Sequence, residues 1–141
     1  MKDRLWPAIL VACALGAATT SERLRPLNDV ATALTGRNPT AALEPFDKTL
    51  PEFNQLSSRF TALTAGYDLE NEIDVQDEQD TPSSTDVTLR WTLTLTSPES
   101  NDQERRTAEI HVRLALRDNK WKIVAFSPID IFDPQPRPHK R

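Results

Sequence analysis

Two polar side chains at the ends of expected elements are the candidates for acid–base chemistry. Tyr67 follows Gly66 at the start of a segment of β type, and Asp47 lies at the end of a helical segment. Phenols and carboxylates are groups that enzymes use as general acids and bases. Both residues also have structural uses, since tyrosines often lie at the edge of a core and aspartates often lie in turns. Tyr67 and Asp47 are the catalytic candidates, and we expect that neither is catalytic.

The acidic side chains gather in one place. Four carboxylates precede Pro82: Asp74, Asp77, Glu78 and Asp80. This pattern is typical of a solvated hairpin loop, and the alternative is a calcium loop. The regular ligand spacing and the turn glycine of known calcium loops are absent. Because the chain has two isolated histidines, His111 and His139, and one cysteine, we expect no metal and no cofactor.

The composition excludes further chemistries. The chain has 141 residues, the length of a single domain. Its net charge of −4 gives no basic footprint for nucleic acid. With three glycines in the whole chain there is no glycine-rich phosphate loop.

The first twenty residues have the layout of a secretory signal. Lys2 and Arg4 precede an apolar run over residues 5–11, and small residues follow. The run is too short to span a membrane as a helix. We therefore expect residues 1–20 to be a signal and the protein to be exported.

The only cysteine, Cys13, decides between two kinds of signal. The segment Leu10-Val11-Ala12-Cys13 resembles the lipobox of bacterial lipoproteins, in which the cysteine becomes the lipidated first residue of the mature chain. The alternative is an ordinary signal that is cut after Ala14 or Ala18. The expected location is accordingly the periplasm, or the membrane surface through a lipid on Cys13.

Alternating apolar residues predict strands of an antiparallel sheet with one buried face. The clearest run is Val87, Leu89, Trp91, Leu93 and Leu95, and a second run extends from Ala108 to Leu116. Four strands are expected, over about residues 67–75, 86–96, 106–116 and 121–126. Among the expected inward residues only Asn71 is polar, so the sheet offers no inward carboxylate.

Three short helices precede the strands. The first is expected to be capped by Asn28 or Asp29 and to end at Gly36. The second is expected over about residues 40–47. The third begins near Pro51 and buries one stripe of side chains: Phe53, Leu56, Phe60 and Leu63.

Two faces of this α+β arrangement are candidate binding surfaces. The concave face holds the residues that would line a ligand pocket: Phe46, Phe60, Asn71, Trp91 and Trp121. The outer face holds Arg90, Thr92, Thr94, His111 and Arg113, whose mixed character allows pairing with a second copy across a two-fold axis. A plain solvated face is the alternative.

Two segments carry a resemblance to a known superfamily. One is the helical opening Val30-Ala31-Thr32-Ala33-Leu34-Thr35-Gly36-Arg37-Asn38 with residues 41–47, and the other is the closing hairpin over residues 114–124 with Phe126-Ser127-Pro128. Together they resemble the nuclear transport factor 2-like superfamily over about residues 26–133. The resemblance implies three helices packed in the concave face of a strongly curled four-stranded antiparallel sheet, a cystatin-like cone. Residues 21–133 would form this domain, and residues 134–141 a disordered tail rich in proline and basic residues.

The superfamily hosts isomerases, dehydratases, cyclases and non-enzymatic binding domains, so the resemblance speaks for a fold more than for a function. We expect a non-catalytic binding or interaction domain of the bacterial cell envelope. Its partner would be a small hydrophobic ligand, an envelope protein or a second copy of the chain. The alternative is an isomerase or lyase that acts on a small hydrophobic molecule, with Tyr67 or Asp47 at the mouth of the pocket.

Overall fold

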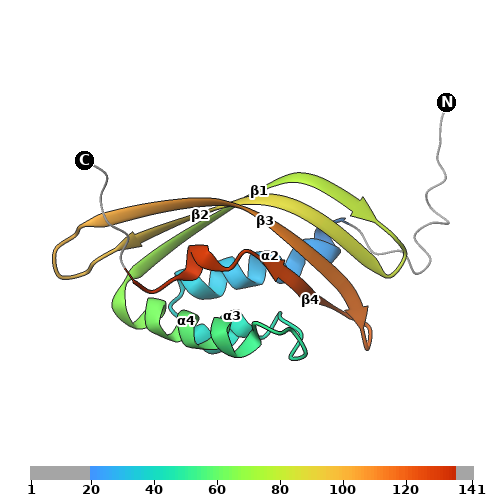
Figure 1. Ribbon diagram of the computed structural model, residues 1–141, viewed down its shortest axis with the longest axis horizontal. Coiled ribbons are helices and arrows are strands. Elements are labelled where there is room, and N and C mark those ends of the chain that lie inside the picture. The colour runs from blue at the N-terminus through green and yellow to red at the C-terminus, as the bar shows by residue number, and fades with distance from the viewer. Residues whose placement is uncertain (1–19, 136–141) are drawn as a thin grey trace.

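A computed structural model describes residues 20–135 of the chain, with side chains from residue 22 (Figure 1). The expected signal, the lipidation of Cys13 and the end of the tail lie outside these residues. The described elements, in chain order, are α2 (Thr20–Thr35), α3 (Pro39–Leu43), α4 (Phe53–Gly66), β1 (Asp68–Asp80), β2 (Ser84–Thr96), β3 (Gln103–Arg117), β4 (Lys120–Ser127) and the short 3₁₀ helix η1 (Asp130–Phe132). Within the described part, no helix is long and apolar enough to cross a membrane.

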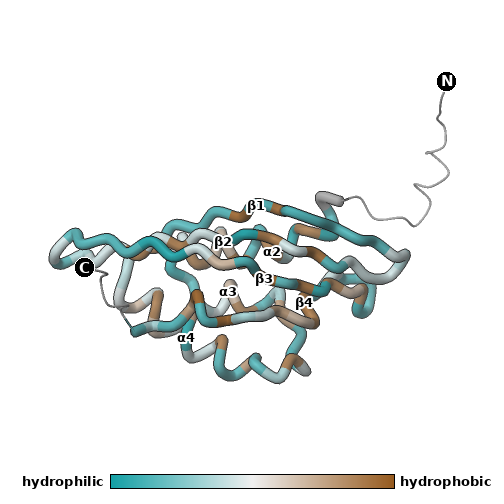
Figure 2. The backbone as a smooth tube through the Cα atoms, turned by 45° about the horizontal axis from the view of Figure 1, so that its top comes forward, coloured by the Kyte–Doolittle hydropathy of each residue, from teal (hydrophilic) through white to brown (hydrophobic). Residues whose placement is uncertain are grey.

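The strands form one antiparallel meander in the order β1-β2-β3-β4, and the helices cover its concave side (Figure 1). The sheet is curved and open, with β1 and β4 at its edges. This confirms the expected α+β architecture. Figure 2 shows the apolar residues recurring along the strands and helices between polar ones, as a two-layer core requires.

The expected inner face of β2 is confirmed, since Val87, Leu89, Trp91, Leu93 and Leu95 are all buried. The hairpin between β3 and β4 turns at Asp118 and Asn119, which both have positive φ angles. Two such residues in sequence are what a two-residue hairpin loop with the right-handed twist of the strands needs.

The expected start of the first helix is wrong. Neither Asn28 nor Asp29 caps it, because α2 already begins at Thr20 and runs through Pro26. Proline in a helix interior costs about 3 kcal/mol. The earlier turn is nevertheless helical because the buried side chain of Arg23 ties it to the sheet.

The second helix is shorter than expected. Asn38 caps α3 through its side-chain oxygen, which accepts a hydrogen bond from the Ala41 amide at 3.0 Å. The helix ends at Leu43, although Glu44 keeps a helical backbone conformation, because Pro45 has no N–H with which to continue the hydrogen-bonded ladder. The chain then lies along the edge of β4, where the Asp47 amide donates to the Ile123 carbonyl at 2.8 Å.

Strand β1 is longer than expected and contains a bulge. Val75 pairs with Leu89 and Asp77 pairs with Thr88, so Gln76 is an extra residue. A bulge residue reverses which side chains face the core further along the strand. Glu78 and Asp80 therefore lie on the inner side, opposite Val87 and Thr85, and not in a solvated loop.

Candidate functional site

The interior of the cone is filled by five aromatic side chains. They are Phe46, Phe60, Trp91, Phe126 and Phe132, each at most 2% exposed. The rings of Trp91 and Phe132 meet edge to face with centroids 5.5 Å apart, and Phe60 meets Phe132 in the same way at 5.1 Å. Such edge-to-face pairs contribute about 1 kcal/mol each beyond the area they bury.

Asn71, the one polar residue expected on the inner face, is occupied by structural hydrogen bonds. The indole N–H of Trp91 donates to its side-chain oxygen at 2.9 Å. Its amide nitrogen donates to the hydroxyl of Thr35 in α2 at 3.2 Å. Asn71 thus provides the hydrogen-bond acceptor for the indole N–H of the buried Trp91, which would otherwise be unpaired in the core.

Of the expected pocket residues, the structure brings four together. Phe46, Phe60 and Trp91 are in the aromatic cluster, and Asn71 lies beside it. Trp121 lies elsewhere. It is half-buried, and the guanidinium of Arg23 stacks over its ring at 4.7 Å from the centroid.

Residues 129–135, which we call the strap, follow β4 and include η1, which packs against α4 and β3. Ile129, Ile131 and Phe132 of the strap are buried. The strap is bound by Arg106, whose side chain is 1% exposed. Its guanidinium donates hydrogen bonds to the carbonyl oxygens of three strap residues, Ile131, Asp133 and Gln135.

Arg106 was not among the expected site residues, although its position in the alternation indicates its burial. It shares a face with Ile110, which is buried. Glu104 provides the counter-charge, with a carboxylate oxygen 2.7 Å from Nε of Arg106. The sequence could have indicated Arg106, because it is a single cation on the apolar side of a strand. A buried cation needs hydrogen-bond acceptors close to it.

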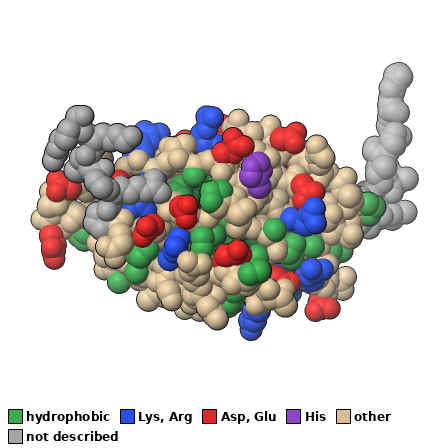
Figure 3. Space-filling view, viewed as in Figure 1, with side chains coloured by type: hydrophobic (Ala, Val, Ile, Leu, Met, Phe, Trp, Pro, Cys, Tyr) green, Lys and Arg blue, Asp and Glu red, His purple; other side chains and the backbone are tan. Residues whose placement is uncertain are grey.

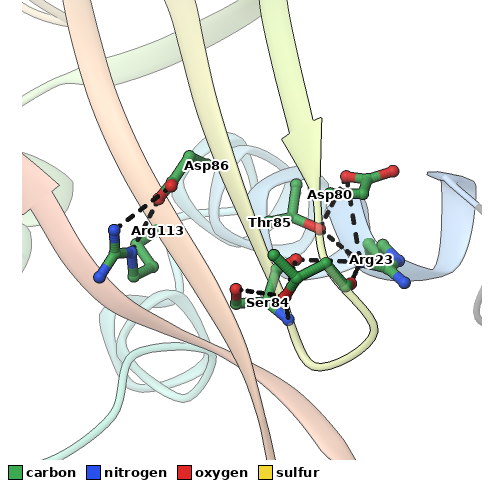
Figure 4. Close-up of polar contacts among 7 residues, drawn as sticks. Arg23, Asp80, Ser84, Thr85, Asp86 and Arg113 are labelled. Atoms are coloured by element: carbon green, nitrogen blue, oxygen red, sulfur yellow. Dashed lines mark hydrogen bonds and ion pairs between the residues drawn. The ribbon is translucent and has the colours of Figure 1, made fainter.

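A second polar cluster lies at the other end of the inner face, where α2 meets the hairpin between β1 and β2 (Figure 4). Arg23 is 6% exposed and belongs to α2. Its Nη1 donates to the carbonyl oxygens of Thr81 at 2.6 Å and Ser84 at 3.0 Å, and to the hydroxyl of Thr85 at 2.9 Å. Asp80 lies 3.9 Å from the same nitrogen.

Glu78 completes this cluster. Burial, followed by the neighbouring carboxylate of Asp80, raises the pKa of Glu78, and the positive charge of Arg23 opposes the shift. One of its carboxyl oxygens, Oε2, is buried without a hydrogen-bond partner. The inner face therefore does hold a carboxyl group, which the sequence pattern failed to predict because it ignored the bulge.

The two catalytic candidates lie outside the aromatic cluster. Tyr67 is half-buried directly after α4, and its amide caps that helix by donating to the Leu63 carbonyl at 3.0 Å. Asp47 accepts from the amide and hydroxyl of Thr49, and Arg117 binds its second oxygen at 3.1 Å. These bonds, chiefly the one from the Thr49 amide, lower the pKa of Asp47, which makes it a weak base.

The outer face of the sheet presents the five expected side chains: Arg90, Thr92, Thr94, His111 and Arg113. Arg113 binds Asp86 across the strands with Nε 2.7 Å from Oδ1, and this hydrogen bond lowers the pKa of Asp86. His111 lies 3.2 Å from the hydroxyl of Thr88. Figure 3 shows acidic and basic side chains interspersed over the molecule, so this view has no region of one charge.

Hollows of ligand size lie on the outside of the cone. One of about 690 Å³ runs between α2, α3 and the start of β4, and Trp121 is among its lining residues. Another of about 660 Å³ lies beside the hairpin between β3 and β4 and includes Asp47 and Arg117. Residues 20–135 contain no cluster of His, Cys, Asp or Glu that could hold a metal ion.

The fold is shared with solved structures of low sequence identity. One is a nuclear transport factor 2-like protein from Salmonella enterica, 13% identical, with a TM-score of 0.61 over 78% of this chain and 92% of the other. A second is a ketosteroid isomerase-like protein from Erwinia carotovora, 9% identical, with a TM-score of 0.61 over 75% and 91%. A third is described as a calcium/calmodulin dependent protein kinase II association domain from Xanthomonas campestris, 18% identical, with a TM-score of 0.59 over 77% and 86%.

These likenesses define the fold as the nuclear transport factor 2-like cone, as the sequence resemblance implied. No family model and no curated protein matches the chain. Proteins with this fold include both isomerase-like and association domains, so the fold leaves the function to be argued from the site.

Proposed function

We propose that this protein is a non-catalytic binding or interaction domain of the bacterial cell envelope. The observation that carries the proposal is the filled cone. The space that a substrate would need is occupied by Phe60, Trp91 and Phe132, and Arg106 binds the strap that carries Phe132. A ligand site normally needs an open, largely pre-formed cavity with a few converging polar groups.

Because the cone is filled, we propose that binding takes place on the outside of the molecule. The outer sheet face is the surface that we propose for an envelope protein or a second copy of the chain. Its strands are long and its side chains are of mixed charge, which suits a self-complementary contact. The hollow beside Trp121 is the alternative place for a small hydrophobic ligand.

Thermal unfolding with small apolar molecules tests the filled cone. We expect indole, a medium-chain fatty acid and a steroid each to leave the Tm of the full chain unchanged. Phe60→Ala is the positive control, because an apolar cavity of this kind stays dry and takes up small aromatic molecules. A saturable rise in Tm of the unaltered protein would report a ligand bound to the folded state. If the rise persisted in Trp121→Ala, which alters the outer hollow, it would contradict the filled cone.

The enzyme alternative keeps one supporting observation, the carboxyl group of Glu78 on the inner face with its raised pKa. Perturbed carboxyl groups are frequent in active sites, and also occur in structural ion-pair networks. The contacts of Arg23 with the hairpin favour the structural role. Saturable binding of an apolar molecule that Glu78→Gln abolishes would favour the enzyme.

The envelope location rests on the N-terminal sequence alone. It is tested by the intact mass and the cell fraction of the native protein beside a Cys13→Ser variant. We expect the native chain to begin at Cys13, to carry a lipid mass and to be found with membranes, and the variant to lose the lipid. An unprocessed chain in the cytoplasm would overturn the location.

A further inference from the structure

The cluster of Arg23, Glu78 and Asp80 brings one cation and two carboxyl groups close together at the edge of the core. Arg23 is committed to the hairpin through its three hydrogen bonds, so it cannot turn fully toward both carboxylates. With both carboxyl groups ionised, the cluster has an excess negative charge and a buried Oε2 of Glu78 without a donor. A buried, unpaired charge is among the most costly arrangements in a protein.

One proton removes both defects. On Glu78 it makes the carboxyl group neutral, balances the single cation against Asp80, and turns an oxygen that lacks a donor into a hydroxyl that can itself donate. The charges that act on Glu78 are Asp80 on its own strand and Arg23 on α2. The remaining described groups of the cluster are uncharged: Thr81 and Ser84 of the hairpin, Thr85 and Val87 of β2, and Trp121 of β4. Glu22, the carboxylate next to Arg23 on α2, is exposed.

We propose that Glu78 is the proton-sensitive element of a latch that holds the first turns of α2 on the β1–β2 hairpin. With the proton bound, Arg23 keeps its contacts with Asp80, Ser84 and Thr85, which Figure 4 shows. When the proton leaves, the carboxylate draws in water, and the contacts between Arg23 and the hairpin loosen. The aromatic core lies at the other end of the inner face and stays packed.

The direction of the pH effect follows from the raised pKa of Glu78. A group whose pKa is higher in the folded state stabilises that state fully below its unfolded pKa, and the stabilisation is lost as the pH rises through the folded pKa. The latch is therefore tight at low pH and loosens as the pH rises through the folded pKa of Glu78. For every pH unit by which the folded pKa of Glu78 exceeds the unfolded pKa, the opening equilibrium changes by about tenfold across this range.

Two measurements on the full chain test the latch. Carbon NMR of the Glu78 carboxyl group follows its titration, and hydrogen exchange, corrected for the intrinsic effect of pH, follows the amides of residues 22–25, 81 and 83–85 from about pH 4 to about pH 8. We expect protection in both segments to fall in step with the loss of the Glu78 proton. In Glu78→Gln the protection should stay high at every pH, because the amide is neutral and can donate.

Glu72→Gln is the matched control, since Glu72 is exposed on the same strand and its replacement should leave the protection of both segments unchanged. Arg23→Met should give low protection at every pH. If Glu78 loses its proton without a change in protection, or if Glu78→Gln keeps the pH dependence of the unaltered protein, the latch is overturned. These two outcomes remain decisive even if Arg23→Met does not fold.

Discussion

At the scale of single residues, Arg106 is the clearest case of a charge that the fold needs. Its planar guanidinium reaches three carbonyl oxygens of the strap and a carboxylate at once. Lysine presents one compact charge and cannot reproduce this fork of donors. The binding of the strap thus depends on the shape of the side chain as well as on its charge.

We expect Arg106→Met to lower the free energy of unfolding by about 3 kcal/mol, because it removes the ion pair with Glu104 and leaves several strap carbonyl oxygens without the donor that Arg106 provides. Urea unfolding followed by circular dichroism measures the loss. Arg105→Met is the control, since Arg105 is the exposed neighbour on the same strand. Equal, small losses in the two variants would show that the strap is held by its apolar residues alone.

Asp47 gives a prediction with the opposite pH dependence to that of Glu78. Its lowered pKa means that it stabilises the fold above its unfolded pKa, and that this contribution is lost as the pH falls through the folded pKa. Asp47→Asn should cost about 1 kcal/mol near neutral pH. The difference from the unaltered protein should shrink in acid.

Urea unfolding at a series of pH values measures this difference, with Asp118→Asn as the control on the neighbouring, exposed hairpin. If the difference in free energy of unfolding between Asp47→Asn and the unaltered protein did not change with pH, the charge of Asp47 would not contribute to stability. The hydrogen bonds of Thr49 would then not depend on the charge.

At the scale of elements, the sequence predicts best where a pattern repeats without interruption. The alternation in β2 and the helical spacing of Leu56, Phe60 and Leu63 in α4 led directly to buried faces. The turn residues Asp118 and Asn119 led to the closing hairpin.

The failures come from single residues that change a pattern. Gln76 adds one residue to β1, and everything after it changes face, including Glu78. Arg106 interrupts an apolar face with a cation, and its partners in the strap lie 25 to 29 residues away along the chain. Neither a bulge nor a carbonyl partner that is distant along the chain leaves a recognisable pattern in the local sequence. Both features therefore become visible only in the folded structure.

The packing of the strap gives a prediction at the scale of elements. Phe132→Ala should destabilise the protein by about 3–5 kcal/mol, as expected for a buried phenylalanine in a packed core. Phe53→Ala removes the same side chain from a half-buried position on α4 and should cost clearly less. Thermal and urea unfolding compare the two, and similar losses would mean that the strap adds little to the core.

At the scale of the whole molecule, the outer sheet face is the surface that we propose for contact with other proteins. We predict a dimer at micromolar concentrations in sedimentation velocity, weakened by the double change Arg90→Glu with Thr94→Glu. Glu52→Lys with Asn54→Lys, near the start of α4, is the control for changed charge elsewhere. If the protein were a monomer at all concentrations, the predicted dimer would be wrong, and a different protein would be the expected partner of the outer sheet face.

The core of this protein is completed by residues that leave the ribosome after helices α2 to α4 and strands β1 to β4. Phe132 and the three strap residues whose carbonyl oxygens Arg106 binds all follow β4 in the chain. Domains generally fold as their segments emerge, N-terminal parts first, yet here the central aromatic cluster lacks a member until the strap has emerged. A nascent chain that cannot close its core stays easier to unfold, and for a protein that we propose is exported, that delay would favour an unfolded chain during passage across the membrane.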